Sequence, residues 1–173
     1  PVRLYEQAID ALNSGHWIEA QQLAAQLAPS APRHGGVHYI AGVAALGLRQ
    51  LPLALGHLQR AAHYNPDRAD YLAQYARALA TAFRMQEALQ VADAATRLPC
   101  GDAVTCDTLG VIYGRANLHA RAAEAFRRAV SLAPGNANFR FNLATSLTFY
   151  GHLDAADEEF EACLAADPHH WRA

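Results

Sequence analysis

The side chains that could carry chemistry in this sequence are nine histidines, three cysteines and a run of carboxylates near the C-terminal end. Paired imidazoles or thiolates hold metals, and a thiol or hydroxyl beside a base attacks substrates, but each needs a fixed spacing. His34 and His38 have a helical spacing, yet a boundary between two repeated segments falls between them. We expect the histidines to be solvated residues near turns. The sequence therefore predicts no catalytic, metal-binding or cofactor-binding site in this chain.

The cysteines and the acidic run have simpler structural interpretations. Cys163 falls at a position that is mostly small along the chain, so we expect it in the core. Cys100 and Cys106 match no zinc-binding spacing, and we expect reduced thiols. A Cys100–Cys106 bridge stays open as an alternative for an oxidising compartment. The carboxylates within 157–161 are expected to cover a solvated helix face.

Composition excludes several classes of protein. The net charge is −2, all 14 basic residues are arginine, and no basic stripe is visible, which argues against nucleic-acid binding. No apolar run is long enough to insert into a membrane. Abundant alanine favours closely packed helices, and with the all-arginine usage it suggests a bacterial gene. We expect a cytoplasmic location, and a periplasmic one stays open.

The elements that position these side chains follow a repeat of 34 residues. When the chain is divided into blocks of 34 from residue 1, certain block positions hold the same kind of residue each time. Position 20 is always alanine and position 8 is always alanine or glycine: Ala20, Ala54, Ala88, Ala122 and Ala156, and Ala8, Gly42, Ala76, Gly110 and Ala144. Position 32 is proline except in block three: Pro32, Pro66, Cys100, Pro134 and Pro168. The boundaries are 1–34, 35–68, 69–102, 103–136 and 137–170.

Each block contains two stretches with helical periodicity. In block four they are expected at roughly 104–116 and 120–132. Small residues at positions 8 and 20 let the two helices approach closely, and bulky residues at positions 11 and 24 fill the gaps between blocks: Tyr113, Phe126, Leu147 and Phe160. Proline at position 32 ends the second helix, because it has no N–H and restricts the residue before it.

This pattern resembles the tetratricopeptide repeat over residues 1–170. The best matches are LGVIYGRANLHARAAEAFRRAVSLAPGN (109–136) and NLATSLTFYGHLDAADEEFEACLAADP (142–168). Block three departs from the family, because its turn Phe83-Arg84-Met85 lacks glycine and Pro99 comes one residue early. The resemblance implies an all-α, right-handed superhelical solenoid of antiparallel helix pairs, with a concave face lined by the first helix of each block. Residues 171–173 would begin a further helix, so we expect the chain to be a fragment.

The resemblance also implies which residues face the groove. In blocks three to five the candidates are Gln74, Arg77, Asp107, Val111, Arg115, Asn138, Phe141, Asn142, Thr145 and Phe149. Arginine suits carboxylates, amides suit a peptide backbone, and phenylalanine supplies apolar anchor area. The lysine-based carboxylate clamp of some relatives is absent in its usual form, since the chain has no lysine. In blocks one and two the same positions are mostly apolar, which predicts either an interface or a face buried by curvature: Tyr5, Ile9, Tyr39, Ile40, Val43 and Leu46.

These features predict a non-catalytic interaction module that binds a protein or peptide partner, with a homodimer as a further possibility through the apolar face. One alternative is the substrate-presenting or dimerising arm of a larger bacterial enzyme of sulfotransferase-like or glycosyltransferase-like type. The ending DPHHWRA is similar to the boundary region of the sulfotransferase-linked kind. A third is an envelope assembly factor such as a pilus-biogenesis lipoprotein.

Overall fold

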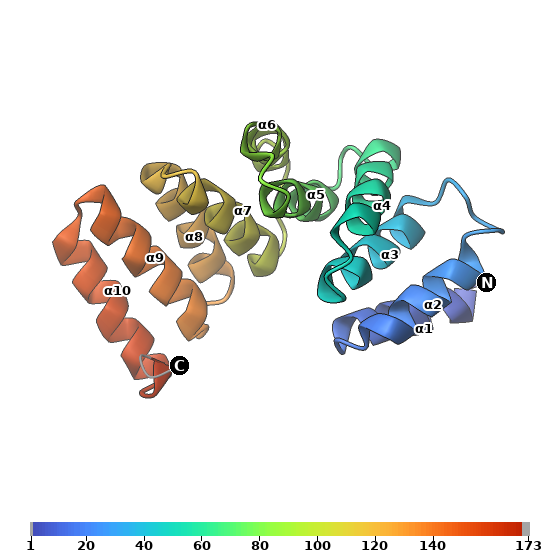
Figure 1. The fold of residues 1–173 in the computed structure, drawn as a ribbon. Coiled ribbons are helices and arrows are strands. Elements are labelled where there is room, and N and C mark those ends of the chain that lie inside the picture. Colours follow the sequence, from blue (N-terminus) through green and yellow to red (C-terminus); the bar gives the residue numbers. More distant parts are fainter. Residues whose placement is uncertain (1, 171–173) are drawn as a thin grey trace. The chain divides into compact units, whose positions relative to one another are not determined.

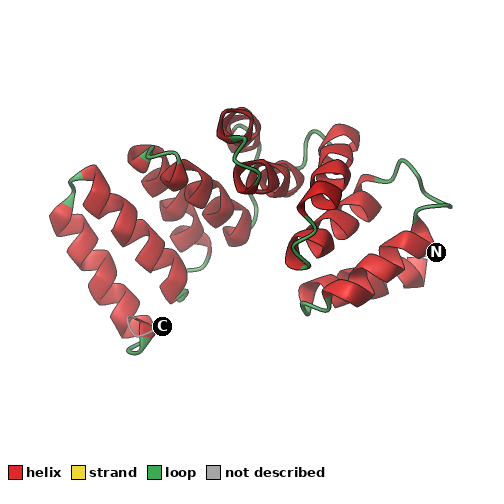
Figure 2. Ribbon diagram, in the orientation of Figure 1, coloured by secondary structure: helices red, strands yellow, loops and turns green. Residues whose placement is uncertain are grey.

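The computed structural model describes residues 2–170 as ten α-helices joined by short loops, with no strand in this range (Figures 1 and 2). In chain order they are α1 (Val2–Asn13), α2 (Trp17–Leu27), α3 (Gly35–Gly47), α4 (Leu51–Tyr64), α5 (Ala69–Thr81), α6 (Met85–Thr96), α7 (Ala103–Arg115), α8 (His119–Leu132), α9 (Ala137–Tyr150) and α10 (Leu153–Ala166). The helix starts and ends expected for block four are correct to within one residue. The further helix predicted to start at 171–173 lies outside the described residues.

Each 34-residue block contains one pair of these helices, packed against each other, and the chain divides into two compact units. The first unit ends at Leu98 and contains α1–α6. The second begins at Pro99 and contains α7–α10. Between residues 2 and 170 we find no helix with the length and apolar character of a membrane span.

The first helices start at side-chain caps in three of the five blocks. The Asp102 carboxylate accepts from the Thr105 amide at 2.7 Å, and the Asn136 side chain accepts from the amides of Asn138 and Phe139. His34 Nδ1 accepts from the Val37 amide at 3.3 Å, so His34 caps α3. Each cap satisfies N–H groups that have no partner within the helix. The first helices of blocks two, four and five therefore begin where the sequence places a polar side chain.

The predicted close approach of paired helices is confirmed at the small residues. The alanines at positions 8 and 20 are buried, with at most 1% of their surface exposed. A Cβ added to Gly42 would lie 2.6 Å from Leu58 Cγ, and one added to Gly110 would lie 2.6 Å from Phe126 Cε1. The bulky side chain of the second helix thus occupies the space that a larger residue at position 8 would need.

We expect Gly110→Ala to destabilise the second unit by about 1–3 kcal/mol, because the Phe126 ring must move out of a filled core. Urea unfolding followed by circular dichroism measures the change. Gly114→Ala is the matched control on the same helix, since its Cβ would meet only Ala122 Cβ at 4.0 Å. Alanine there should hold or raise stability through its better helix propensity. Equal destabilisation by both substitutions would contradict the close-approach explanation.

The turn between paired helices has one conformation in all five blocks. Block position 15 has a positive φ each time: Gly15 (73°), Arg49 (59°), Phe83 (60°), Asn117 (60°) and Gly151 (90°). Block three therefore adopts the same turn without a glycine, although its sequence departs from the pattern. Left-handed backbone is costly for a bulky residue, and the Phe83 side chain is 91% exposed, so no packing offsets the cost within the first unit.

Phe83→Gly should therefore stabilise the first unit by about 1 kcal/mol, because glycine adopts a positive φ without a steric penalty. Thermal unfolding of the two proteins measures the difference. The reciprocal change, Gly151→Ala, serves as the control: it introduces the same strain where no atom lies within 4 Å of the new Cβ. It should lower stability. If Phe83→Gly lowers stability instead, the ring makes a contact that the turn conformation does not account for.

Candidate functional site

The apolar surface predicted in blocks one and two is more covered than expected. Tyr5, Ile9, Tyr39, Val43 and Leu46 are half-buried and pack against the core of the first unit. Tyr39 stacks on Tyr71 of the next block, with ring centroids 4.4 Å apart. Ile40 is a correction: its exposed fraction is 1%, so it belongs to the core and not to a surface.

One pocket opens beside Tyr5 in the first unit. It has a volume of about 320 Å³ and is bounded by α1, the end of α2 and the start of α3. Tyr5 and His34 form an edge-to-face pair with centroids 5.2 Å apart. The pocket is mostly apolar and is at the small end of ligand pockets, which span ~300–1,000 Å³. Its lining residues are Val2, Tyr5, Leu27, Ser30, Ala31, His34 and Val37.

The two polar candidates on α5 differ in exposure. The Arg77 side chain reaches solvent, but its neighbours partly desolvate it and so lower its pKa. Among residues 2–170 its guanidinium has no carboxylate partner. Gln74 lies one turn earlier and is only 7% exposed, so it is a core-facing amide and not the solvated groove residue expected. Its Oε1 atom is buried and accepts no hydrogen bond from the described residues. Buried amides without partners are rare, because the lost hydrogen bond to water is not replaced.

In the second unit, α7 and α9 bring the predicted residues of blocks four and five together. Asn142 Nδ2 donates to Asp107 Oδ1 at 2.8 Å across the two helices. Burial raises the pKa of the Asp107 carboxyl, and the bond from Asn142 opposes that shift. Within the described chain Asp107 forms no ion pair. Helix α7 thus presents a half-buried carboxylate that forms no ion pair with any cation of residues 2–170.

The other candidates of the second unit are on the same two helices, α7 and α9. Val111 and Phe141 are each about 40% exposed, Thr145 is half-buried, and Arg115 is exposed. Asn138 Oδ1 lies 2.8 Å from His170 Nε2, and the His170 ring lies against Phe141. Phe149 is 68% exposed and stacks on His119 with centroids 5.0 Å apart.

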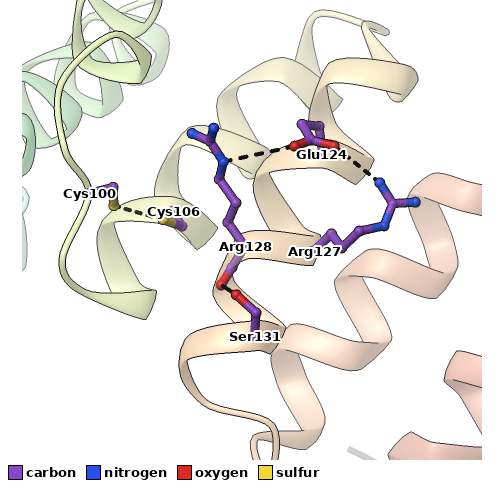
Figure 3. A network of polar contacts seen from close by, with 6 residues as sticks. All are labelled: Cys100, Cys106, Glu124, Arg127, Arg128 and Ser131. Carbon is purple, nitrogen blue, oxygen red and sulfur yellow. Dashed lines mark hydrogen bonds and ion pairs between the residues drawn. The ribbon is translucent and has the colours of Figure 1, made fainter.

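Two inter-repeat loops are tied to the helix that follows them. In each, the side chain at block position 4 donates to the backbone carbonyl at position 32 of the previous block, six residues earlier. His38 Nε2 donates to the Pro32 carbonyl at 3.0 Å, and Arg140 Nε donates to the Pro134 carbonyl at 2.8 Å. At the junction of blocks three and four the same two positions hold Cys100 and Cys106, whose sulfur atoms are 2.7 Å apart (Figure 3). Sequence analysis left a Cys100–Cys106 bridge open as an alternative but missed that the register of the repeat brings the two residues together.

A partly buried histidine pair was also missed. His38 is 5% exposed, which corrects the expectation of a solvated residue, and its Nδ1 lies 3.0 Å from His57 Nδ1. Because His38 Nε2 donates to a carbonyl, neutral His38 must accept at Nδ1, and His57 Nδ1 must donate. Burial lowers the pKa of His57, and His38 and Arg60 lower it further. No sequence signal marks this pair, since His57 is on the second helix of its block.

The polar residues of α8 form a surface network. Glu124 accepts from Arg127 at 3.2 Å and lies 3.8 Å from Arg128, with all three side chains exposed (Figure 3). Among the described residues, no three histidine, cysteine or acidic side chains gather closely enough to hold a metal ion.

Comparison with known proteins identifies the repeat. One family model described as tetratricopeptide repeat matches residues 5–61, 41–102 and 108–148. A second model with the same description matches residues 137–170. The chain belongs to the tetratricopeptide repeat family. It is therefore an all-α solenoid of the kind that serves as a protein-interaction scaffold. No curated protein sequence matches the chain.

Several solved structures share the fold at low sequence identity. A crystal structure of MamA has a TM-score of 0.71 at 16% identity, covering 99% of this chain and 93% of that one. MamA 41-end from Desulfovibrio magneticus RS-1 has a TM-score of 0.73 at 20% identity, covering 97% and 96%. YrrB, a TPR protein described as having an unusual peptide-binding site, has a TM-score of 0.70 at 15% identity, covering 95% and 84%.

The histidine pair should make the first unit sensitive to acid. Because the pKa of His57 is lower in the folded state than the unfolded value of about 6.5, the unfolded chain binds more protons as the pH falls below that value. The free energy of unfolding should therefore fall from neutral pH towards pH values below the unfolded pKa. Urea unfolding at several pH values measures this loss. His57→Gln should reduce it, whereas His63→Gln, at an exposed site of the same helix, should not. An unchanged pH profile in His57→Gln would contradict the assignment.

Proposed function

We propose that the chain is a non-catalytic interaction module in which the first helices of the repeats hold an extended peptide or a helix of a partner protein. The observation that carries the proposal is that Arg77 on α5 and Asp107 on α7 form no ion pair among residues 2–170. An isolated charge on the surface has little effect on folding stability. A partly buried charge lowers stability unless an opposite charge or a hydrogen bond pairs with it. The peptide-binding site named for YrrB, which has the same fold, also supports the proposal.

The first unit suits an acidic group of the partner. The Arg77 guanidinium is fixed in its charge and offers forked donors to a carboxylate. Burial lowers its pKa, so a carboxylate arriving beside it would relieve an unfavourable charge.

The second unit suits a basic group of the partner. Asp107 is half-buried, its pKa is raised by burial, and it accepts a hydrogen bond from the Asn142 side chain. The neighbouring Val111 and Phe141 expose apolar surface, which suits the aliphatic stem of an arginine or lysine. The amide of Asn142 remains able to accept from a peptide N–H through its oxygen.

A displayed library of random peptides tests the proposal, because it needs no knowledge of the natural partner. We expect the chain to enrich a shared motif, and a peptide carrying that motif to bind in a calorimetric titration. Arg77→Ala or Asp107→Asn should weaken this binding about tenfold or more, since hydrogen bonds to charged groups contribute about 1.5–3 kcal/mol. Either substitution is informative, because the motif can engage one unit or both.

Two controls separate groove binding from general charge effects. Arg60→Ala in α4 and Asp157→Asn in α10 remove the same charges from exposed positions on second helices, and binding should remain unchanged. The proposal fails if no motif is enriched. It also fails if both first-helix variants bind the selected peptide as tightly as the unmodified chain.

A further inference from the structure

The thiols of Cys100 and Cys106 are placed by the repeat itself. Cys100 replaces the proline found at position 32 of the other blocks, and Cys106 is at position 4 of block four. At two other junctions these positions are joined by a hydrogen bond from the position 4 side chain to the position 32 carbonyl. The loop geometry at these junctions therefore brings the two positions into contact. Because both positions hold cysteine at this junction, a contact between two thiols replaces the hydrogen bond from a side chain to a backbone carbonyl.

The two sulfur atoms are 2.7 Å apart, which is closer than two sulfurs in van der Waals contact (Figure 3). A disulfide has an S–S distance of about 2.05 Å, so bond formation requires a movement of less than about 1 Å. The Cys100 thiol also donates to the Asp102 carbonyl at 3.3 Å, and Asp102 caps α7 through Thr105. The loop is thus held at the start of α7 before any covalent bond forms.

The two cysteines differ in access. Cys100 is partly exposed on the loop, whereas Cys106 is buried in the first turns of α7. An exposed thiol followed by a buried one in contact with it is an arrangement suited to stepwise exchange, because the first attacks from solvent and the second resolves. Cys163 is buried elsewhere, on α10, and its thiol donates to the Ala137 carbonyl at 3.2 Å.

We propose that Cys100 and Cys106 form a reversible redox site, in which oxidation by a low-molecular-weight disulfide closes a covalent bond between the inter-repeat loop and α7. The Cys100 thiolate attacks one sulfur of the small disulfide and releases one molecule of thiol, leaving a mixed disulfide. Cys106 then loses its proton to solvent, and its sulfur attacks Cys100 Sγ and releases the second thiol. In sum the protein dithiol loses two electrons and two protons, and the small disulfide is reduced to two thiols.

The surroundings of Cys106 make its attack the slower step. Burial raises the pKa of the Cys106 thiol to about 12, with further increases from Cys100 and Asp102 and an opposing effect of Arg128. Closure should therefore become faster as the pH rises. The bond would join Cys100, near the start of the second compact unit, to Cys106 on α7 of the same unit. Oxidation would therefore fix the loop that opens the second unit to the first helix of that unit.

Incubating the reduced chain with mixtures of oxidised and reduced glutathione, followed by alkylation and trypsin digestion, tests the site. Trypsin cuts after arginine, so Cys100 and Cys106 share the peptide 98–115 while Cys163 is in 141–172. We expect the peptide 98–115 to lose two hydrogens and to take up no alkylating group, while 141–172 remains alkylated. The equilibrium constant for closure should be about tenfold larger, or more, in the folded chain than in concentrated urea.

Variants at the cysteines complete the test. Cys163→Ser should leave closure unchanged, and Cys106→Ser should stop the reaction at the mixed disulfide of Cys100. Because Cys106 is buried, Cys100→Ser is a second variant at a less demanding position, and it should leave Cys106 reduced. The proposal is overturned if 98–115 keeps both thiols, or if only the mixed disulfide accumulates in the unmodified chain. It is also overturned if closure is no more favourable in the folded chain than in urea.

Discussion

The close approach of the two helices in each block is the constraint on which the rest of this structure depends. Where position 8 is glycine, the side chain from the partner helix occupies the space that a Cβ would need. Where position 8 is alanine, the residue is completely buried. Helices that approach this closely fix each other's rotation, so every other position on them has a defined direction. The bulky residues at positions 11 and 24 are therefore directed to defined places in the packing.

This packing overrides local preferences. Arginine, phenylalanine and asparagine adopt the same left-handed backbone at position 15 as the two glycines do. None of these side chains favours that conformation as glycine does, so the energy must come from the helix pair on either side of the turn. The same argument explains why one family profile matches blocks with such different turn sequences. The packing of the two helices therefore determines the turn conformation, and the turn does not determine the packing.

The fold was predictable from the sequence because the repeat specifies the packing positions five times over. The helix bounds of block four, the burial of Cys163 and the small contacts at positions 8 and 20 all follow from register alone. Register gives the direction of a side chain but not how much of it a neighbour covers. That is why Ile40 and Gln74 were expected at a surface and are buried. The His38–His57 pair depends on two side-chain conformations in different helices, which no periodicity records.

The junctions show how a repeat leaves room for chemistry. The pair formed by position 32 and the following position 4 holds an imidazole–carbonyl bond in one place, a guanidinium–carbonyl bond in another and two thiols in a third. At the remaining junction position 4 is Leu72, which has no polar group to offer. Folding therefore does not require a polar contact there, because a leucine serves as well. The fold places positions 32 and 4 beside each other but does not fix their residue types. Substitutions at these positions can therefore introduce a reactive pair of side chains without loss of the architecture.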